Sequence, residues 1–226
     1  AYETKNALRR QGDTKAILHV GIEEWPFPIP IVKKGEKWSF DTKEGHQELL
    51  NRRIGRNELN TIQVCLAYVD GQREYAAKDR NGDGLLEYAQ KFLSTPGKKD
   101  GLYWKTQAGE EESPFGDLIA TAAREGYKKT NDKPIPYHGY YFKILKAQGK
   151  NAPGGAYDYI IKGRMIGGFG MVAYPAKYGA SGVMSFLVNH EGVVYEKNLG
   201  KDTVKIARRL LLFNPDKTWK PVTDRQ

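Results

Sequence analysis

Asp79-Arg-Asn-Gly-Asp-Gly-Leu-Leu-Glu-Tyr-Ala-Gln90 is the stretch around which the rest of the chain is arranged. Side-chain oxygens at its first, third and fifth positions, followed by a glycine and a backbone carbonyl, form the pattern of a calcium-binding loop. The predicted ligands are Asp79, Asn81, Asp83, Leu85 through its carbonyl, Glu87 and Gln90. An EF-hand has a bidentate glutamate at the twelfth position, so Gln90 departs from the pattern and Glu87 has to act directly or through water.

The same residues have a second interpretation. Aspartates in polar turns accept hydrogen bonds from backbone N–H groups and cap the segment that follows. Both interpretations predict a loop clamped between packed elements, and they differ in whether a structural Ca²⁺ is bound. Millimolar calcium outside the cytoplasm fills even a weak site, so the calcium interpretation suits an exported protein.

The composition indicates a folded chain with a basic surface. Of 226 residues, 39% are hydrophobic and 12% are aromatic, which is too much apolar surface for a disordered chain. Lys and Arg number 36 against 27 Asp and Glu, so a net charge of +9 favours an acidic protein, an acidic cell surface or a nucleic acid as the partner. The single Cys65 excludes an internal disulfide and does not identify the compartment.

No membrane-spanning segment and no leader is recognisable in the sequence. The sequence contains no apolar run of the roughly 20 residues that a transmembrane helix needs, and it begins at Ala1 without a basic-then-apolar leader. Such a start is expected of a processed or trimmed protein. An artificial chain boundary would look the same, so the start at Ala1 does not identify the compartment.

The longest helical pattern leads directly into the predicted calcium loop and is expected to cover residues 57–78. The apolar residues that recur at three- and four-residue spacing are Leu59, Ile62, Cys65, Leu66 and Val69. They share one helix face, which has to be buried. Within that stripe, Cys65 is expected to be a core residue and not a reactive thiol.

Residues 1–55 are predicted to form a small N-terminal unit, and residues 56–226 the main domain. Extended segments predict a β-hairpin unit within the first part, at residues 16–20, 25–32 and 37–40. Prolines keep the middle segment at a sheet edge. The charged residues 1–14 show no period and are interpreted as the remnant of a longer element.

Helix signals follow this hairpin unit and recur after the calcium loop. Asp41, with Glu44 three residues later, predicts a capped short helix that ends at Gly55. A further turn or two of helix is expected at residues 88–93. The other predicted features of this region are a helix that starts at Ser113-Pro114 and stops at Gly126, and a loop at residues 128–133.

The second half of the sequence predicts an antiparallel β-meander. Runs of aromatic and β-branched residues, separated by glycine-containing turns, lie at 138–145, 157–161, 168–174, 182–188 and 193–195. Residues 189–192 are predicted to connect the last two strands tightly. A short helix is expected from Asp202, with Val204, Ala207 and Leu211 on its apolar side, in the most basic part of the chain, residues 197–226.

The sequence shows no signature of nucleophilic catalysis. His138 and His190 are candidate zinc ligands or bases, but neither has a second histidine or cysteine at ligand spacing, which favours structural roles. A hydrolase of cell-wall or polysaccharide substrates would depend on Glu87, Asp158 or Glu191, with two carboxyl groups about 5–10 Å apart in a cleft. Nucleic-acid binding has the charge but no recognition helix or stacking motif.

Several motifs together resemble the secreted bacterial family catalogued as domain of unknown function 2950. They include Trp25-Pro-Phe-Pro-Ile-Pro, Asn51-Arg-Arg-Ile-Gly-Arg-Asn-Glu, the Asp79 loop, Tyr137-His-Gly-Tyr-Tyr-Phe, Gly154-Gly-Ala-Tyr-Asp-Tyr and Asn189-His-Glu-Gly-Val-Val-Tyr. The resemblance covers nearly the whole chain. It implies export through a cleaved signal peptide, so an extracytoplasmic protein, either periplasmic or secreted, is expected. The family carries no established activity.

The part of the chain from residue 57 also resembles the headgroups of type IV pilin-like and pseudopilin subunits. The residues concerned are the helical run itself, Gly139-Tyr-Tyr-Phe, Ala173-Tyr-Pro, Ser181-Gly-Val-Met-Ser-Phe and Glu191-Gly-Val-Val-Tyr. That resemblance implies a helix packed on an antiparallel sheet and calcium held in a loop. The apolar N-terminal helix through which pilins polymerise is missing.

These observations predict an α+β protein in which the helix of residues 57–78 packs across a C-terminal antiparallel sheet. The leading functional hypothesis is a non-enzymatic envelope or extracellular protein that carries a structural calcium ion and acts by contact with a protein or an acidic cell surface. The alternatives are the hydrolase and the nucleic-acid binder.

Overall fold

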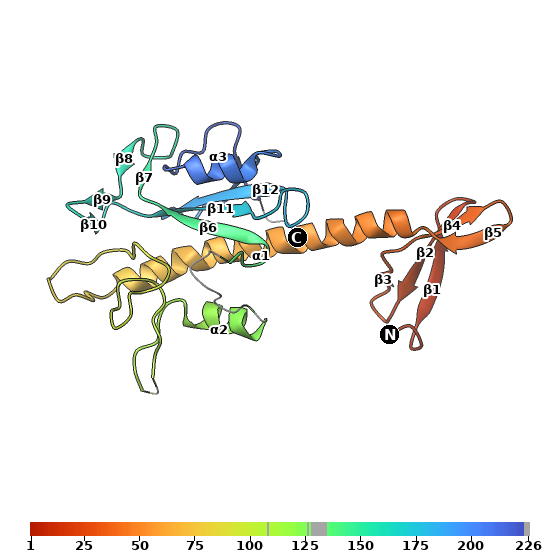
Figure 1. Cartoon of the computed structure of the whole chain (residues 1–226), viewed down its shortest axis with the longest axis horizontal. Coiled ribbons are helices and arrows are strands. Elements are labelled where there is room, and N and C mark those ends of the chain that lie inside the picture. Colours follow the sequence, from red (N-terminus) through yellow and green to blue (C-terminus); the bar gives the residue numbers. More distant parts are fainter. Residues whose placement is uncertain (108, 126, 128–134, 224–226) are drawn as a thin grey trace. The chain divides into compact units, whose positions relative to one another are not determined.

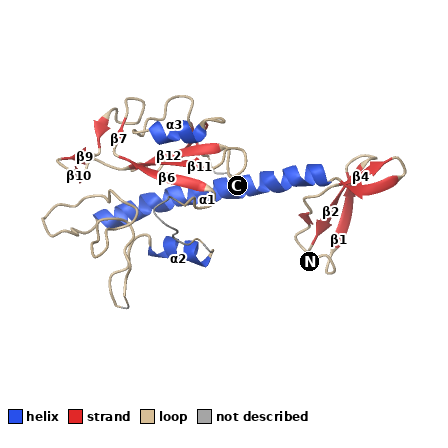
Figure 2. Cartoon of the chain, viewed as in Figure 1, coloured by secondary structure: helices blue, strands red, loops and turns tan. Residues whose placement is uncertain are grey.

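The computed structural model describes residues 1–107, 109–125, 127 and 135–223. It is an α+β structure that divides into two compact units, Ala1–Arg56 and Asn57–Gln226, and each unit is described by itself (Figures 1 and 2). The loop predicted at residues 128–133 and the helix stop predicted at Gly126 lie outside the described residues.

The first unit contains a five-stranded antiparallel sheet and the start of a helix. Its strands are β1 (Asn6–Arg10), β2 (Lys15–Val20), β3 (Trp25–Pro26), β4 (Ile31–Lys34) and β5 (Lys37–Phe40). They are ordered β1-β2-β4-β5, and β3 pairs with β2. Within residues 1–14, for which no strand was predicted, β1 pairs in register with β2. Four of its five residues are exposed, so β1 lacks the alternation of apolar and polar residues that identifies a half-buried strand.

Helix α1 (Thr42–Ala76) is one helix where two were predicted. Asp41 caps its start as expected, because the carboxylate Oδ1 accepts the backbone N–H groups of Lys43 and Glu44 at 3.1 and 3.0 Å. Gly55, predicted to end the first helix, lies inside α1. An interior glycine costs a helix only about 1 kcal/mol, which does not stop a helix with good helix-forming residues on both sides.

The second unit is built on an antiparallel meander, as predicted. Its strands are β6 (Tyr140–Leu145), β11 (Gly170–Pro175), β12 (Met184–Asn189), β13 (Tyr195–Asn198) and β14 (Lys220–Pro221), in the order β14-β13-β12-β11-β6. The strand expected at residues 157–161 is outside this sheet. It is split between two small pairs: β7 (Ala147–Gln148) with β8 (Tyr157–Asp158), and β9 (Ile160–Ile161) with β10 (Arg164–Met165).

The core of this unit lies between α1 and the sheet, and Figure 1 shows the helix running along β6 and β11. Residues from the helix and from the sheet form one buried cluster, which includes Ile62, Cys65, Tyr68, Val69, Phe169, Met171, Phe186 and Val188. Tyr68 also donates a hydrogen bond to the carbonyl of Gly170 at 3.2 Å. The prediction of a core cysteine is confirmed, since Cys65 has no exposed surface.

The buried stripe of α1 includes the predicted Ile62, Cys65 and Val69 but differs at other positions. Leu59 and Leu66 are 46% and 38% exposed, and the polar residues Glu58, Thr61 and Gln72 are buried instead. Each of the three has a backbone partner. The Glu58 carboxylate, for example, accepts the N–H groups of Val183 and Met184 at 2.9 and 3.0 Å. Buried polar groups are tolerated when they are hydrogen-bonded, which a pattern of apolar residues does not reveal.

Three further segments differ in detail from the predictions. Residues 88–93 are not helical, because the backbone of Tyr88 bonds to Met165 and that of Phe92 to Tyr103. Helix α2 (Gly116–Arg124) exists but starts after Phe115, without a side-chain cap from Ser113. Helix α3 (Thr203–Arg209) begins after Asp202 as predicted and ends before Leu211, which is exposed.

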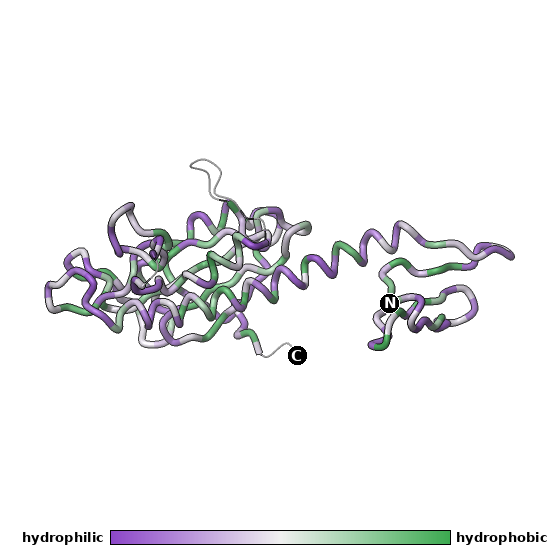
Figure 3. The backbone as a smooth tube through the Cα atoms, turned by 90° about the horizontal axis from the view of Figure 1, so that it is seen from below, coloured by the Kyte–Doolittle hydropathy of each residue, from purple (hydrophilic) through white to green (hydrophobic). Residues whose placement is uncertain are grey.

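Hydrophobic and hydrophilic residues are mixed along α1 in Figure 3. Among the described residues, no helix combines the length and the apolar character that crossing a membrane requires. This agrees with the absence of a transmembrane run in the sequence.

Candidate functional site

The loop after α1 is folded around the carboxylate of Asp79. Its Oδ1 accepts the backbone N–H groups of Asn81 and Gly82 at 3.2 and 2.8 Å, and its Oδ2 accepts that of Gly84 at 2.7 Å. These bonds, first of all the one from Gly84, hold the pKa of Asp79 below its ordinary value. Gly82 and Gly84 have φ angles of 75° and 82°, a conformation that glycine adopts without strain.

Two further predicted ligands of this loop converge on one arginine. Asp83 forms an ion pair with the guanidinium of Arg164 in β10, and Glu87 binds the same group at 3.2 and 3.3 Å. Asn81 donates its amide N–H to Glu87 at 3.1 Å. Asp83, Glu87 and Asn81 are therefore brought together, and the positive charge at their centre comes from the protein itself.

The other predicted ligands lie apart from this group. Gln90 donates its amide N–H to the carbonyl of Gly163 at 2.8 Å, so it connects the loop to the turn before β10. The backbone N–H of Leu85 bonds to Asp83, and the Leu85 side chain is exposed. Within the described ranges, no three His, Cys, Asp or Glu side chains are gathered closely enough to hold a metal ion.

The donor set nevertheless fits a hard cation. Its atoms are carboxylate, amide and carbonyl oxygens within one short segment, and these are the ligands that Ca²⁺ prefers. The Asp79 carboxylate bonds to backbone N–H groups of this segment, and residues 79, 81, 83 and 87 all belong to it. A cation would have to replace the ion pairs of Arg164 to reach Asp83 and Glu87.

Two sets of contacts, here called anchors, hold the loop of residues 79–90 to the rest of the second unit. Neither was predicted from the sequence. The side chain of Arg80 is only 6% exposed and lies over the rings of Tyr75 and Trp104, 4.9 and 5.0 Å from their centres. Its guanidinium binds Glu111 at 3.0 Å. Gln72 of α1 forms the second anchor, because its amide exchanges two 2.8 Å hydrogen bonds with the backbone of Ala89. No local sequence signal links these residues, since each anchor joins positions far apart in the chain.

The two candidate histidines occupy different surroundings. His190 packs its ring against Gly168, and its Nε2 shares a 3.2 Å hydrogen bond with the hydroxyl of Tyr157. His138 lies 3.4 Å from Glu125 through Nε2 and 3.2 Å from the amide nitrogen of Asn60 through Nδ1. The backbone φ of His138 is 46°, which a non-glycine residue rarely adopts. Neither Glu125 nor Asn60 was singled out from the sequence.

The three carboxylates considered for a hydrolase have different immediate neighbours. Glu87 is paired with Arg164, and Glu191 lies 3.9 Å from Nε2 of His190. Asp158 is on the exposed strand β8.

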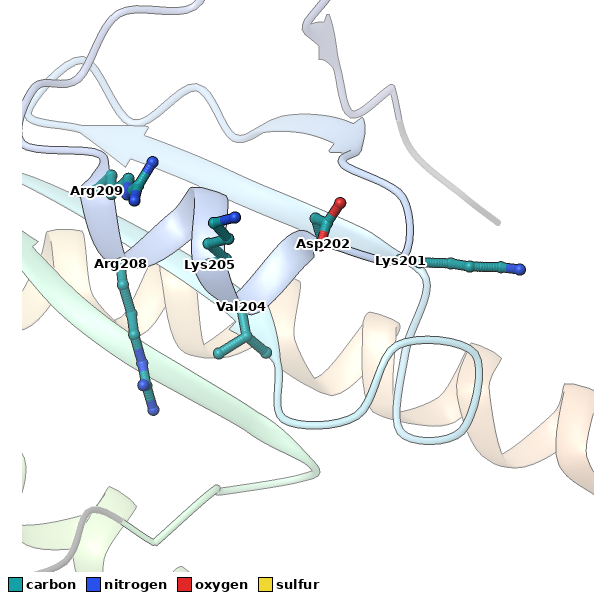
Figure 4. Close-up of a pocket in the computed structure, with 6 residues that line it drawn as sticks. All are labelled: Lys201, Asp202, Val204, Lys205, Arg208 and Arg209. Atoms are coloured by element: carbon teal, nitrogen blue, oxygen red, sulfur yellow. The ribbon is translucent and has the colours of Figure 1, made fainter.

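The basic part of the chain forms a surface at α3. A shallow hollow there is lined by Lys201, Asp202, Val204, Lys205, Arg208 and Arg209. Figure 4 shows that the cationic side chains spread in different directions, with Lys201 and Arg208 pointing away from Lys205 and Arg209. They therefore do not form a pocket for one small anion.

Comparison with known proteins gives one match. A family model described as "Protein of unknown function (DUF2950)" matches residues 1–222. No curated protein and no solved structure matches the chain.

Proposed function

The chain belongs to the DUF2950 family of proteins of unknown function, and from this premise we propose that it is an extracytoplasmic, non-enzymatic protein that acts by contact and carries a structural Ca²⁺ in the loop of residues 79–90. The contact partner is a protein or an acidic cell surface. The absence of a catalytic signature in the sequence and the net charge of +9 support a binding role.

The arrangement of the Asp79 loop is the observation that carries the calcium proposal. Three backbone N–H groups of the loop bond to the carboxylate of Asp79, and the carboxylates of Asp83 and Glu87 share the guanidinium of Arg164. A bound Ca²⁺ would take oxygens of Asp79, Asn81, Asp83, Leu85 and Glu87. The ion would supply a divalent charge that holds these oxygens together, and binding to the folded state alone would stabilise it.

The calcium proposal is tested by metal analysis and by thermal unfolding in chelator and in excess calcium. At about a hundred times Kd, a ligand stabilises the folded state by about 2.7 kcal/mol, which corresponds to a Tm increase of about 5–10 °C for a chain of this size. Asp83→Asn keeps the side-chain shape and should remove most of the increase. Asp70→Asn is the matched control, because Asp70 is an exposed carboxylate of α1 and should leave the increase intact.

The Arg164→Gln variant distinguishes a loop that binds Ca²⁺ from a loop that is stabilised only by the Arg164 side chain. If Ca²⁺ replaces Arg164, the variant is less stable in chelator and gains more from calcium than the wild type, because the competing cation is gone. If Arg164 is the permanent counter-ion, the variant loses stability that calcium does not restore. That second result, together with an unchanged wild-type Tm, would overturn the calcium proposal and leave the polar-turn interpretation.

The pilin-like architecture belongs to the same proposal. A helix packed on an antiparallel meander supports it, and an experimental structure with a matching strand order and calcium loop would test it.

Localisation is tested by fractionating cells that express the natural gene, and recovery in the cytoplasm alone would contradict export.

A hydrolase is the second candidate function, and the surroundings of His138 favour it. A histidine with a neighbouring carboxylate is a common general base, and unfavourable backbone angles often occur at functional sites. The test is release of soluble fragments from peptidoglycan or polysaccharide by the wild type and by His138→Gln. Equal release, or none from either protein, would exclude this role.

A further inference from the structure

The surface around α3 combines exposed aliphatic side chains with cations. We call it the α3 face and define it by Lys201, Lys205, Ile206, Arg208, Arg209, Leu211 and Leu212. Leu211 is 72% exposed, Leu212 41% and Ile206 39%. The underside of the helix is already packed, since Thr203 and Ala207 are buried. These three aliphatic side chains therefore are not needed to fill the core.

A hollow beside α3 extends this aliphatic area. Its lining consists of Leu187, Lys197, Leu199, Ile206, Arg209, Leu210, Leu211, Leu212, Asn214, Asp216 and Trp219. Arg209 lines both this hollow and the basic one, so the aliphatic and cationic areas adjoin. Lys197 lies over the ring of Trp219, 5.9 Å from its centre, and adds another cation to the lining.

The charge of this region is strongly one-sided. Asp202 and Asp216 are the acidic residues that line the two hollows, whereas five Lys and Arg residues line them. The cations spread over the surface instead of converging (Figure 4). This spacing suits an extended anionic surface better than one phosphate group.

The aliphatic residues decide between two extended anionic partners. A nucleic acid or another hydrated polyanion is bound through charge and aromatic stacking, and exposed leucines contribute nothing to such a contact. Lipid bilayers bind both the aliphatic and the cationic side chains. Aliphatic side chains enter the boundary between headgroups and acyl chains, while Lys and Arg remain at anionic headgroups.

We propose that the α3 face docks on the surface of a bilayer that contains anionic lipids. Leu211, Leu212 and Ile206 enter the interface, and Lys205 and Arg209 bind the headgroups. This inference extends the proposed contact function by naming the partner. It does not depend on calcium, because the α3 face shares no residue with the loop of residues 79–90.

Co-sedimentation of the full chain with vesicles tests the inference. Vesicles of equal parts phosphatidylcholine and phosphatidylglycerol should pellet the protein in the presence of chelator, whereas pure phosphatidylcholine vesicles should not. Added salt should weaken the binding. Lys205→Glu with Arg209→Glu should lower the affinity at least about 25-fold, because each cation near an anionic membrane contributes about a fivefold factor. Lys98→Glu with Lys105→Glu is the control of equal charge, at exposed residues outside the α3 face.

A second pair of variants tests the aliphatic contribution. Leu211→Ser with Leu212→Ser should also weaken vesicle binding strongly and leave Tm close to that of the wild type, because Leu211 is 72% and Leu212 41% exposed. Ile22→Ser is the control, since Ile22 is 78% exposed in the first unit. Vesicle binding that survives the leucine change, or binding to duplex DNA without binding to vesicles, would overturn the inference. Vesicle binding in chelator combined with no effect of calcium on Tm would support this inference and reject only the calcium site.

Discussion

Arg80 behaves differently from its neighbours in the proposed calcium loop. The residues around it face solvent, whereas its guanidinium lies over the rings of Tyr75 and Trp104 and against Glu111. A buried guanidinium that loses its carboxylate partner is strongly destabilising. The charge of Glu111 therefore helps to fix where the loop leaves α1, although Glu111 lies 31 residues away in the sequence.

Replacement of Glu111 by Gln should destabilise the protein in a pH-dependent manner. Hydrogen bonds from Lys78 and Arg80 lower the pKa of Glu111 from 4.5 to about 2, so the folded state favours the charged form. The charged Glu111 therefore contributes fully to stability above the pKa near 4.5 that it has in the unfolded chain. This contribution is lost as the pH falls toward 2. At neutral pH we expect a loss of about 1–3 kcal/mol, reduced by partial exposure of the pair.

Chemical unfolding between neutral pH and pH 2 measures this effect. The difference between wild type and Glu111→Gln should be constant above pH 5 and shrink below it. Glu112→Gln is the control, because this neighbouring carboxylate is exposed. A difference that stays the same down to pH 2 would show that the Glu111 charge does not carry the effect.

Local residue patterns explain which parts of the site the sequence could predict. Asp79, Asn81 and Asp83 alternate within five positions, and their spacing alone identifies a cation loop or a polar turn. Arg164 is 81 residues from Asp83, and no periodicity connects them. The sequence therefore indicated the anions of this site but not the cation that they bind in the folded chain.

Helix α1 connects the sequence pattern to the packing of the second unit. Ile62, Cys65 and Val69 were predicted to be buried and are. The register of the stripe was nevertheless wrong at Leu59 and Leu66, because Glu58 and Gln72 take buried positions through hydrogen bonds to distant backbone groups. Such bonds depend on the tertiary fold, so an apolar pattern predicts the existence of the helix better than its rotation.

Replacement by alanine should change the stability of the protein in opposite directions at two glycines of α1. A Cβ at Gly71 would lie 2.7 and 3.0 Å from ring atoms of buried Phe115. Gly71→Ala should therefore lose about 1–3 kcal/mol by overpacking, which exceeds the gain in helix propensity of about 1 kcal/mol. A Cβ at Gly55 meets no atom within 4 Å, so Gly55→Ala should gain up to about 1 kcal/mol.

Urea unfolding followed by circular dichroism compares the two variants, and each serves as the control for the other. A loss of stability in Gly55→Ala would indicate that the helix does end there, with the glycine in a conformation that alanine avoids. A gain in Gly71→Ala would show that Phe115 can move away without cost.

At the scale of the whole molecule, the second unit has a chemical reporter of its integrity. Cys65 lies in the buried cluster that α1 forms with the sheet, and burial raises its pKa well above the ordinary value. The thiolate is the reactive form, so both exposure and ionisation require the helix to leave the sheet. Reaction of Cys65 with a thiol reagent therefore measures how often this unit opens.

At neutral pH, Cys65 in the native protein should be labelled more slowly than in a denatured sample. The ratio of the two rates should equal the equilibrium constant for opening of the unit. Gly71→Ala should speed the reaction about tenfold for each 1.4 kcal/mol that it destabilises the unit, because opening is the step that both measurements share. If Ca²⁺ binds the loop after α1, calcium should slow labelling, and Asp83→Asn should remove that protection. Native labelling at the rate of the denatured chain would contradict the packing of α1 on the sheet, and the Cys65→Ser variant verifies that the signal comes from this thiol.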